Sequence, residues 1–463
     1  MARMRALLGS LSVCALLIGC ATIQNDPVNV AGTPPDLANS LGPAFQENTS
    51  ADETIIGLSF SGGGTRAAAY AYGVLSEMER FPVRGAQGSM VDRIEFISGV
   101  SGGSVTAAYY GLTKKAGLAD FREKFLLRNA EEDLQTNLNL ATFSRAMAGG
   151  VNDSTGLPRW LDANLFHGAT FGEFRAIGKP RVWINASDIY NRTPFVFGAV
   201  TFNAICSDLS KYPLADAVAA SAAVPVAFAP IVIQSFPQKC DRPLPAWVER
   251  VRRDRNAQPL LSGFANALTK YHEGAVPYIK LLDGGLVDNF GLSGFTIARL
   301  SSDKPYGPLS PKQAVKLRRV LFLVVDASAP GPSPEWINTV EGPRGADLVR
   351  ATADTALGAS VAGSFTAFES TMNDWQGTLV RWRCGLSTAD RARYGAGPRW
   401  NCRDVKFFIG RLGFNQLDPA RTERLNKVPT RFHLPQDQVD DVIEAGRETL
   451  RTSPVFKSFA ASL

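Results

Sequence analysis

Short apolar runs alternate with helix-compatible stretches in the first part of the chain. Residues 54–60 and 94–97 are apolar and β-favouring, and each leads through a glycine-rich turn into a stretch typical of a helix, at 67–80 and 105–110. Two such units in succession predict parallel strands, because parallel neighbours need a long crossover connection. We therefore expect an α/β fold with a mainly parallel sheet and helices on its faces.

Later apolar runs predict further strands of the same sheet, at 180–185, 278–282, 320–325 and 405–410. The run Val-Leu-Phe-Leu-Val-Val at 320–325 has no polar position, so it is expected to be central and covered on both faces. Near the C-terminus, residues 437–451 place valine, isoleucine and leucine on one helical face, which predicts a packing helix.

Two segments in the middle of the chain need separate interpretation. Residues 214–233 are largely apolar, but Asp216, Pro225 and Pro230 interrupt them. A buried helix followed by a turn is therefore expected there, and not a membrane span. Residues 235–275 are rich in proline and arginine. This pattern fits either a lid or membrane-facing insertion, or a solvated surface excursion.

The N-terminus has the pattern of a secretory signal over residues 1–19. Arg3 and Arg5 precede a fourteen-residue apolar run that is too short to span a bilayer. The run ends in Leu-Ile-Gly-Cys20, which resembles the lipobox of bacterial lipoproteins. The resemblance implies that the mature chain starts at Cys20 and carries an acyl anchor there. The alternative is an ordinary signal peptide with an incidental cysteine.

The organisation after the signal follows from composition. Residues 20–53 are rich in proline, asparagine, serine and threonine, which predicts a flexible, lipidated tether before a folded body at 54–463. Ala21, and not aspartate, follows the cysteine, which favours the outer membrane of the cell envelope. The net charge is +6 and falls to +4 without residues 1–19, which is too weak to indicate nucleic-acid binding.

Four cysteines remain in the body of an exported chain, which predicts two disulfides. Proximity in sequence favours Cys206–Cys240 and Cys384–Cys402, one of three possible pairings. None of the cysteine spacings is typical of a zinc site, so no metal is expected.

The candidate nucleophile is Ser101, in Gly-Val-Ser-Gly-Gly between a predicted strand and a predicted helix. This is the pattern of a nucleophile elbow, a sharp turn that exposes a serine. A serine nucleophile needs a base, and the chain has only three histidines, none of them at a strand end: His167, His272 and His433. His433 follows the candidate acids, as the base of an α/β-hydrolase triad would. A dyad without histidine is the other possibility.

Asp283 is the candidate partner for such a dyad. It ends an apolar run and precedes two glycines, a position that predicts the carboxyl edge of a parallel sheet. If it is buried, its pKa rises towards the working pH and it can accept the serine proton directly. Asp288 is the rival carboxylate, and we expect it to brace the loop.

Residues 61–64, Ser-Gly-Gly-Gly, follow a strand and precede a helix. Backbone N–H groups at such a helix start bind a phosphate or an oxyanion. The loop lacks the lysine of a P-loop and the spacing of a dinucleotide site. Arg66, directly after it, is expected either to brace the loop or to attract an anionic head group.

Four blocks in this order, at 62–66, 99–104, 220–230 and 283–285, resemble the patatin-like phospholipase family. The resemblance extends over about residues 55–327, with weaker echoes at 437–450. It implies a three-layer α/β/α sandwich and ester hydrolysis of a glycerolipid at a membrane surface, without metal or cofactor. Ala67 departs from the pattern, since a glycine often follows the arginine.

The resemblance also implies the role of each site residue. Ser101 would be the acyl-accepting nucleophile and Asp283 the base of a Ser-Asp dyad. The oxyanion hole would be formed by the N–H groups of Gly62, Gly63 and Gly64. Two alternatives remain at this stage: a Ser-His-Asp esterase of α/β-hydrolase type, and a non-enzymatic envelope lipoprotein that uses the pocket for binding.

Overall fold

A computed structural model describes residues 23–32, 53–83, 88–132, 134, 145, 149–331 and 333–463. The predicted signal peptide at 1–19 and the predicted lipidation site Cys20 lie outside these ranges. Within them, no helix combines the length and the apolar character that crossing a membrane requires.

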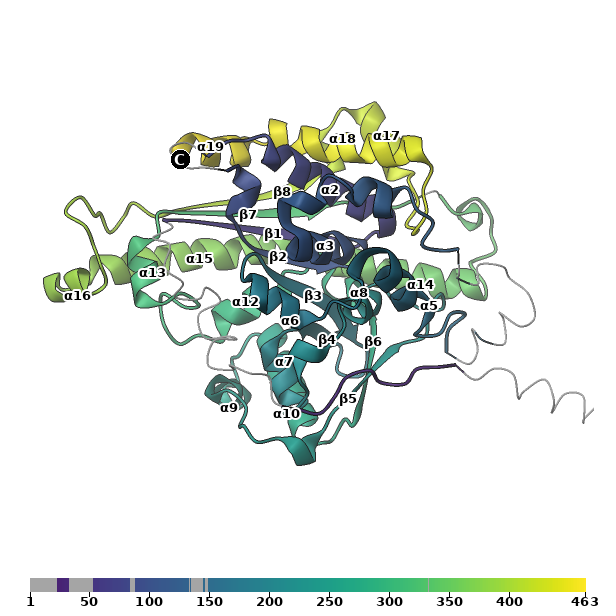
Figure 1. The fold of residues 1–463 in the computed structure, drawn as a ribbon, viewed down its shortest axis with the longest axis horizontal. Coiled ribbons are helices and arrows are strands. Elements are labelled where there is room, and N and C mark those ends of the chain that lie inside the picture. The colour runs from purple at the N-terminus through teal and green to yellow at the C-terminus, as the bar shows by residue number, and fades with distance from the viewer. Residues whose placement is uncertain are drawn as a thin grey trace, which may run out of the picture.

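One eight-stranded sheet forms the centre of the described structure (Figure 1). Its order is β5-β6-β3-β2-β1-β7-β8, with β4 also paired to β3. Five neighbouring strands are parallel to one another, namely β3, β2, β1, β7 and β8. Strands β4, β5 and β6 form antiparallel pairs. The strands are β1 (Thr54–Phe60), β2 (Ile94–Val100), β3 (Arg181–Asp188), β4 (Thr193–Phe197), β5 (Ile231–Gln234), β6 (Tyr278–Asp283), β7 (Arg319–Asp326) and β8 (Lys406–Gly413). The predicted mainly parallel sheet is confirmed.

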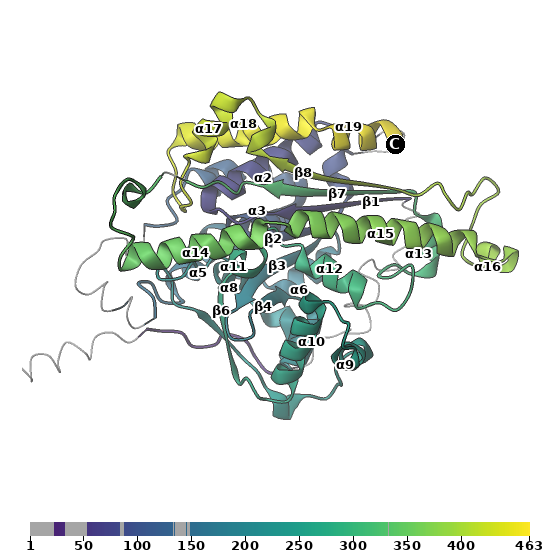
Figure 2. The same cartoon turned by 180° about the vertical axis from the view of Figure 1, so that it is seen from behind.

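Helices cover both faces of this sheet, as Figures 1 and 2 show from opposite sides. Helices α2, α3 and α18 lie on one face, and α14 and α15 cross the other. The described helices of six residues or more are α2 (Gly64–Glu79), α3 (Gly102–Gly117), α5 (Gly156–Leu161), α6 (Phe171–Ile177), α7 (Ala199–Ala204), α8 (Leu214–Ser221), α9 (Ala246–Arg253), α10 (Pro259–His272), α12 (Ser293–Leu300), α13 (Pro311–Lys316), α14 (Ala346–Val361), α15 (Ser364–Cys384), α16 (Thr388–Arg393), α17 (Pro419–Asn426), α18 (Gln436–Thr452) and α19 (Pro454–Ser462). The three-layer α/β/α sandwich is confirmed.

Strand β7 shows why the sheet is buried on both sides. Its side chains alternate between two hydrophobic clusters: Leu321 and Leu323 belong to one, and Val320 and Phe322 to the other. Alternation of this kind follows from the two-residue period of a strand. The prediction that residues 320–325 are central and covered on both faces is therefore confirmed.

Two details of the middle of the chain differ from the sequence prediction. Residues 214–233 form helix α8 and a turn as expected, but they end in the short strand β5. Residues 235–275 contain helices α9 and α10, and Trp247 stacks on Phe264 with ring centroids 6.4 Å apart. The apolar face of this segment belongs to the main core, and its role as a lid stays a prediction.

The described part of the predicted tether, residues 23–32, is bound to the body. The Asn29 side chain donates to the carbonyl oxygen of Gln234 at 2.8 Å and accepts from its N–H at 2.9 Å. The Ser154 N–H also donates to the Gln24 carbonyl oxygen at 3.1 Å. The flexible tether predicted for residues 20–53 is therefore held against the body over residues 23–32, where an asparagine amide satisfies the open edge of β5.

Both predicted disulfides are present. Cys206 pairs with Cys240 and Cys384 with Cys402, with Cα–Cα distances of 5.1 and 4.9 Å. The Cα separations are normal for disulfides.

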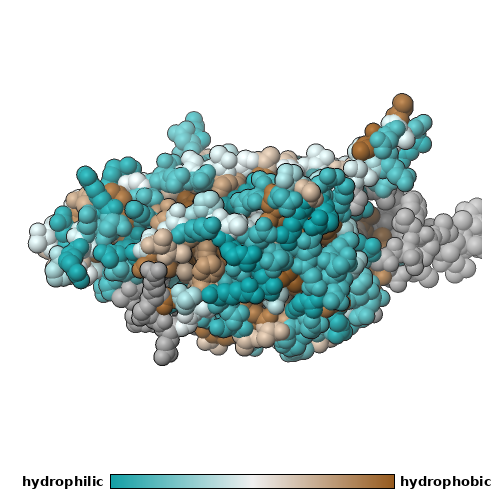
Figure 3. Space-filling model, turned by 90° about the horizontal axis from the view of Figure 1, so that it is seen from above, coloured by the Kyte–Doolittle hydropathy of each residue, from teal (hydrophilic) through white to brown (hydrophobic). Residues whose placement is uncertain are grey.

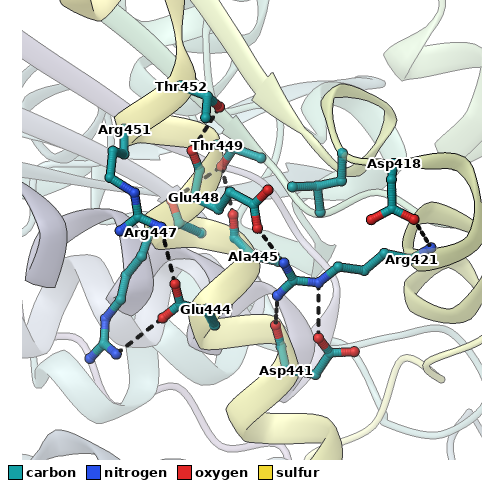
Figure 4. Close-up of polar contacts among 12 residues, drawn as sticks. Asp418, Arg421, Asp441, Glu444, Ala445, Arg447, Glu448, Thr449, Arg451 and Thr452 are labelled. Atoms are coloured by element: carbon teal, nitrogen blue, oxygen red, sulfur yellow. Dashed lines mark hydrogen bonds and ion pairs between the residues drawn. The ribbon is translucent and has the colours of Figure 1, made fainter.

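Ion pairs join helices α17 and α18 into a C-terminal hairpin (Figure 4). Arg421 binds Asp441 at 3.0 Å and also pairs with Glu448, and Arg424 binds Asp441 at 2.9 Å. Partly exposed pairs of this kind contribute on the order of 1 kcal/mol or less each. The ion pairs matter because they hold the two helices together, and the loop between these helices reaches the candidate site.

Candidate active site

Ser101 occupies a strained turn between β2 and α3. Its backbone has φ 51° and ψ −125°, an uncommon conformation for a residue with a side chain. Outliers of this kind cost roughly 1–3 kcal/mol and concentrate at functional sites. The side chain is almost fully buried, with 3% exposed. The predicted elbow is therefore present.

The glycines of the elbow permit direct contact with the glycine loop. A Cβ on Gly102 would lie 1.8 Å from the carbonyl oxygen of Gly64, and one on Gly103 would lie 2.5 Å from that of Ser61. No side chain fits at either position. The two glycine-rich stretches, which lie about forty residues apart in sequence, therefore form one site.

Asp283 lies beside the serine at the end of β6. Its carboxylate accepts the Gly285 N–H at 2.8 Å, and the Ser101 side chain lies close enough to lower the pKa of this carboxyl as a hydrogen-bond donor. Burial nevertheless raises the pKa of Asp283 to about 6, because desolvation outweighs the stabilisation of the charged form by Gly285 and Ser101. The structure thus places Ser101 near the buried Asp283, and their catalytic partnership stays a prediction.

The direction of the strand that carries Asp283 differs from the expectation. β6 is antiparallel to β3 and pairs only with its last residues, with Asp283 opposite Ala186. β3 extends beyond the end of β2, whose Val100 pairs with Asn185. Asp283 therefore reaches the carboxyl edge of the parallel strands on an antiparallel strand of the same sheet.

Ser221, at the end of α8, connects the nucleophile to the aspartate turn. Its Oγ accepts the Ser101 N–H at 2.8 Å and donates to the carbonyl oxygen of Asn185 at 2.6 Å. Its own carbonyl oxygen accepts the Gly284 N–H at 3.0 Å. The sequence analysis did not assign this role, although Ser221 lies in the block at 220–230. Its position in that block was the available signal.

We expect Ser221→Ala to lower kcat by about 10- to 100-fold with little change in KM, because the elbow loses the acceptor that fixes its N–H. The unpaired groups should also reduce the free energy of unfolding by about 1–3 kcal/mol. Steady-state kinetics on a soluble ester and thermal unfolding measure the two effects. Unchanged kcat in a folded variant would contradict the positioning role.

The glycine loop supplies fewer free donors than predicted. The Gly62 N–H donates to the carbonyl oxygen of Asn289 at 3.1 Å and is therefore occupied. Gly63 and Gly64 open helix α2, where N–H groups have no partner in the helix ladder. The chain after Asp283 returns beside the glycine loop, which brings the Asn289 carbonyl oxygen to the Gly62 N–H. Gly63 and Gly64 remain as donors.

Arg66 braces this loop from inside the protein. Only 2% exposed, it donates to the carbonyl oxygen of Ala327 at 3.0 Å, to the hydroxyl of Thr430 at 3.1 Å, and to Val428. Burial lowers its pKa to about 10. Of the two predicted roles, bracing is confirmed. Attraction of a head group is wrong, because the guanidinium is enclosed by protein carbonyls.

The other candidate residues, Asp288 and the three histidines, have different surroundings from Ser101 and Asp283. Asp288 accepts the Ser293 N–H at 2.6 Å, which confirms that it braces the loop at the start of α12. His167 and His433 are exposed, and His272 lies next to Cys206. Among the described residues, no histidine is hydrogen-bonded to Ser101.

One group of residues has metal-like spacing within the part of the chain that the structure describes. Cys206, Cys240 and His272 place their ligand atoms within 4.8 Å of one another. The two cysteines form a disulfide, so their sulfurs are not thiolate ligands.

Comparison with known proteins identifies the family of the chain. Residues 58–296 match the profile of the patatin-like phospholipase family, and no curated protein sequence matches the chain. Among solved structures, human GIVD cytosolic phospholipase A2 has a TM-score of 0.42 and 12% identity, over 95% of this chain and 67% of that one. VipD from Legionella pneumophila has a TM-score of 0.30 and 13% identity, over 96% of this chain and 73% of that one. Because the profile match covers just over half of the sequence, the chain belongs to the patatin-like phospholipase family.

Proposed function

We propose that this protein is a serine lipid acyl hydrolase that cleaves carboxylic ester bonds of glycerolipids. The observation that carries the proposal is the position of Ser101, on its strained elbow, beside the buried carboxylate of Asp283. A pKa of about 6 leaves Asp283 ionised at neutral pH and close to the working range of a general base.

In the proposed acylation step, the Ser101 Oγ attacks the ester carbonyl carbon while Asp283 accepts the hydroxyl proton. The tetrahedral oxyanion accepts hydrogen bonds from the N–H groups of Gly63 and Gly64. When the carbon–oxygen bond to the glycerol breaks, Asp283 returns the proton to the leaving oxygen. An alcohol, the lysolipid, departs and the acyl group stays on Ser101.

Deacylation repeats these roles with water. Asp283 accepts a proton from the water that attacks the acyl carbon, and it returns that proton to the Ser101 oxygen as the fatty acid leaves. Helices α2 and α3 both begin at this point, so the positive ends of two helix dipoles lie near the developing negative charge. Both steps balance in atoms and charge without a metal or a cofactor.

We further propose that the enzyme acts at the outer membrane, held there by an acyl anchor on Cys20. The support is the sequence pattern of residues 1–20, with its basic start, short apolar run and lipobox-like end. The proposed substrates are accordingly phospholipids of the membrane to which the chain is attached.

The test combines covalent labelling with product analysis. The folded protein should react with a fluorophosphonate probe at Ser101. It should also release fatty acid and lysophospholipid from vesicles of phosphatidylethanolamine and phosphatidylglycerol. A Ser101→Ala preparation identifies background hydrolysis. A folded protein that neither reacts with the probe nor releases fatty acid would favour the non-enzymatic lipoprotein.

A further inference from the structure

Exposed apolar side chains are concentrated on the segment that leads into α14. Among the described residues, eleven large apolar side chains are exposed, and four of them lie within thirteen residues. They are Ile337 at 53%, Val340 at 102%, Leu348 at 52% and Val349 at 42% exposed. Figure 3 shows a projection with apolar atoms at its tip, at the end of the molecule where the loop between β7 and α14 lies in Figure 1. Concentrated exposed apolar surface marks an interaction site.

The same helix touches the catalytic turn at its other end. The Ser360 hydroxyl donates to the carbonyl oxygen of Gly285 at 2.8 Å, and the Leu357 side chain lies where a Cβ on Gly285 would be. Gly285 in turn donates its N–H to Asp283. One helix therefore runs from the exposed apolar segment to the residue that holds the catalytic carboxylate.

The N-terminal segment points to the same side. The Ile23 side chain lies within 3.6 Å of the Cβ position of Gly149. Val151 and Asn152 are hydrogen-bonded to residues 226–229, and the Asp283 N–H donates to the carbonyl oxygen of Ala223 in the same block. Figures 1 and 2 both show the segment 23–32 running from the middle of the molecule towards the end at which α14 starts. Cys20 precedes Ile23 by three residues, a reach of roughly 10 Å.

We propose that residues 337–349 form a bilayer-docking surface that places the active site on a phospholipid membrane. The inference rests on the proposed function for the nature of the substrate. Its occupant is a lipid bilayer because the apolar side chains project from the body and because an anchor at Cys20 would hold this end against lipid.

The charges of this surface favour no particular head group. Exposed residues of both signs surround the apolar side chains, namely Glu335, Glu341, Arg344, Asp347 and Arg350. A mixed charge of this kind suits zwitterionic as well as anionic lipid, so burial of apolar side chains is expected to supply the affinity. Phosphatidylcholine vesicles are therefore an adequate probe.

The first experiment measures binding without catalysis or acylation. The full chain carrying Cys20→Ser and Ser101→Ala is sedimented with phosphatidylcholine vesicles, with and without Ile337→Ser and Leu348→Ser. We expect these two changes to weaken vesicle binding by about tenfold or more. Equal binding would overturn the proposal, and so would loss of a dimer in size-exclusion chromatography, which would make this face a self-association surface.

The chain offers a matched control pair at the amino-terminal ends of the parallel strands, away from the candidate site. Ile177 and Leu463 are 38% and 39% exposed. Both residues lie near the amino ends of the parallel strands. Ile177 ends helix α6, shortly before β3 starts at Arg181, and Ser462 accepts a hydrogen bond from Arg319, the first residue of β7. Ile177→Ser with Leu463→Ser should leave vesicle binding unchanged. An equal loss in this pair would overturn the proposal, because binding would then depend on general surface hydrophobicity.

A second experiment separates this proposal from the proposed function. In the chain with Ser101 intact, Ile337→Ser with Leu348→Ser should reduce hydrolysis of vesicle phospholipid by about tenfold and leave hydrolysis of a short soluble ester unchanged. Equal loss on both substrates would overturn the docking role. Absence of activity on both substrates in the unaltered chain would instead contradict the proposed function, and the sedimentation result would still decide the docking surface.

Discussion

Ser101→Ala is expected to lower kcat/KM for a short-chain nitrophenyl ester by about 10⁴-fold or more. The reason is that the acyl-enzyme route needs the Ser101 oxygen, whereas the oxyanion donors alone stabilise direct attack by water only weakly. The Asp283 carboxylate stays in place in this variant, since it is still bonded to the Gly285 N–H. The measurement is the rate of nitrophenol release, with fluorophosphonate labelling alongside.

A neighbouring serine provides the control for this variant. Ser104 is fully buried in the same turn, and its hydroxyl donates to the Ser101 carbonyl oxygen at 2.6 Å. Ser104→Ala therefore disturbs the packing of the elbow but leaves the nucleophile, so its activity should fall by far less. If Ser101→Ala had the same unfolding transition as the unaltered protein and kept its activity, the assignment of the nucleophile would be wrong.

The sequence predicted best where a segment's local pattern decides its structure. Residues 54–60 form β1 as predicted, because an apolar run bounded by a glycine loop has few alternatives. Asp283 was found by the same means, as a carboxylate between an apolar run and two glycines. The direction of β6 could not be predicted in this way, since it depends on pairing with β3, about ninety residues earlier.

Features that depend on distant contacts were not predictable from one sequence. The hydroxyl of Ser221 meets the Ser101 N–H across 120 residues. The Gly62 N–H is occupied by Asn289, which no spacing rule indicates. Helices α14 and α15 were missed because much of their surface is exposed and their apolar positions do not form a strong stripe.

The candidate site also depends on residues beyond the family match, which ends at residue 296. Arg66, which braces the glycine loop at 61–64, is hydrogen-bonded to Ala327, Val428 and Thr430. The Thr65 N–H donates to the Arg431 carbonyl oxygen at 2.8 Å. The loop of the C-terminal hairpin is therefore a structural part of the candidate site.

Asp283→Asn is expected to lower kcat/KM by about 10²- to 10⁴-fold, because an amide cannot accept the Ser101 proton. In the unaltered enzyme, activity should fall about tenfold for each pH step of one below about 6, as the carboxylate becomes protonated. The pH profile of kcat/KM measures this limb. Persistent activity in Asp283→Asn, with loss in His433→Ala, would favour the triad esterase.

The same substitution is expected to stabilise the fold. Burial raises the pKa of Asp283 from 3.8 to about 6, so at neutral pH the folded state holds a charge that the unfolded state carries without cost. The difference corresponds to about 3 kcal/mol of unfolding free energy. This gain in stability of Asp283→Asn over the unaltered protein is absent below about pH 4, grows between about pH 4 and 6, and is fully present above about pH 6. Denaturant unfolding of both proteins at pH 4 and pH 8 tests it. An Asn variant that is no more stable than the unaltered protein at pH 8 would mean that Asp283 is not held as a costly buried charge.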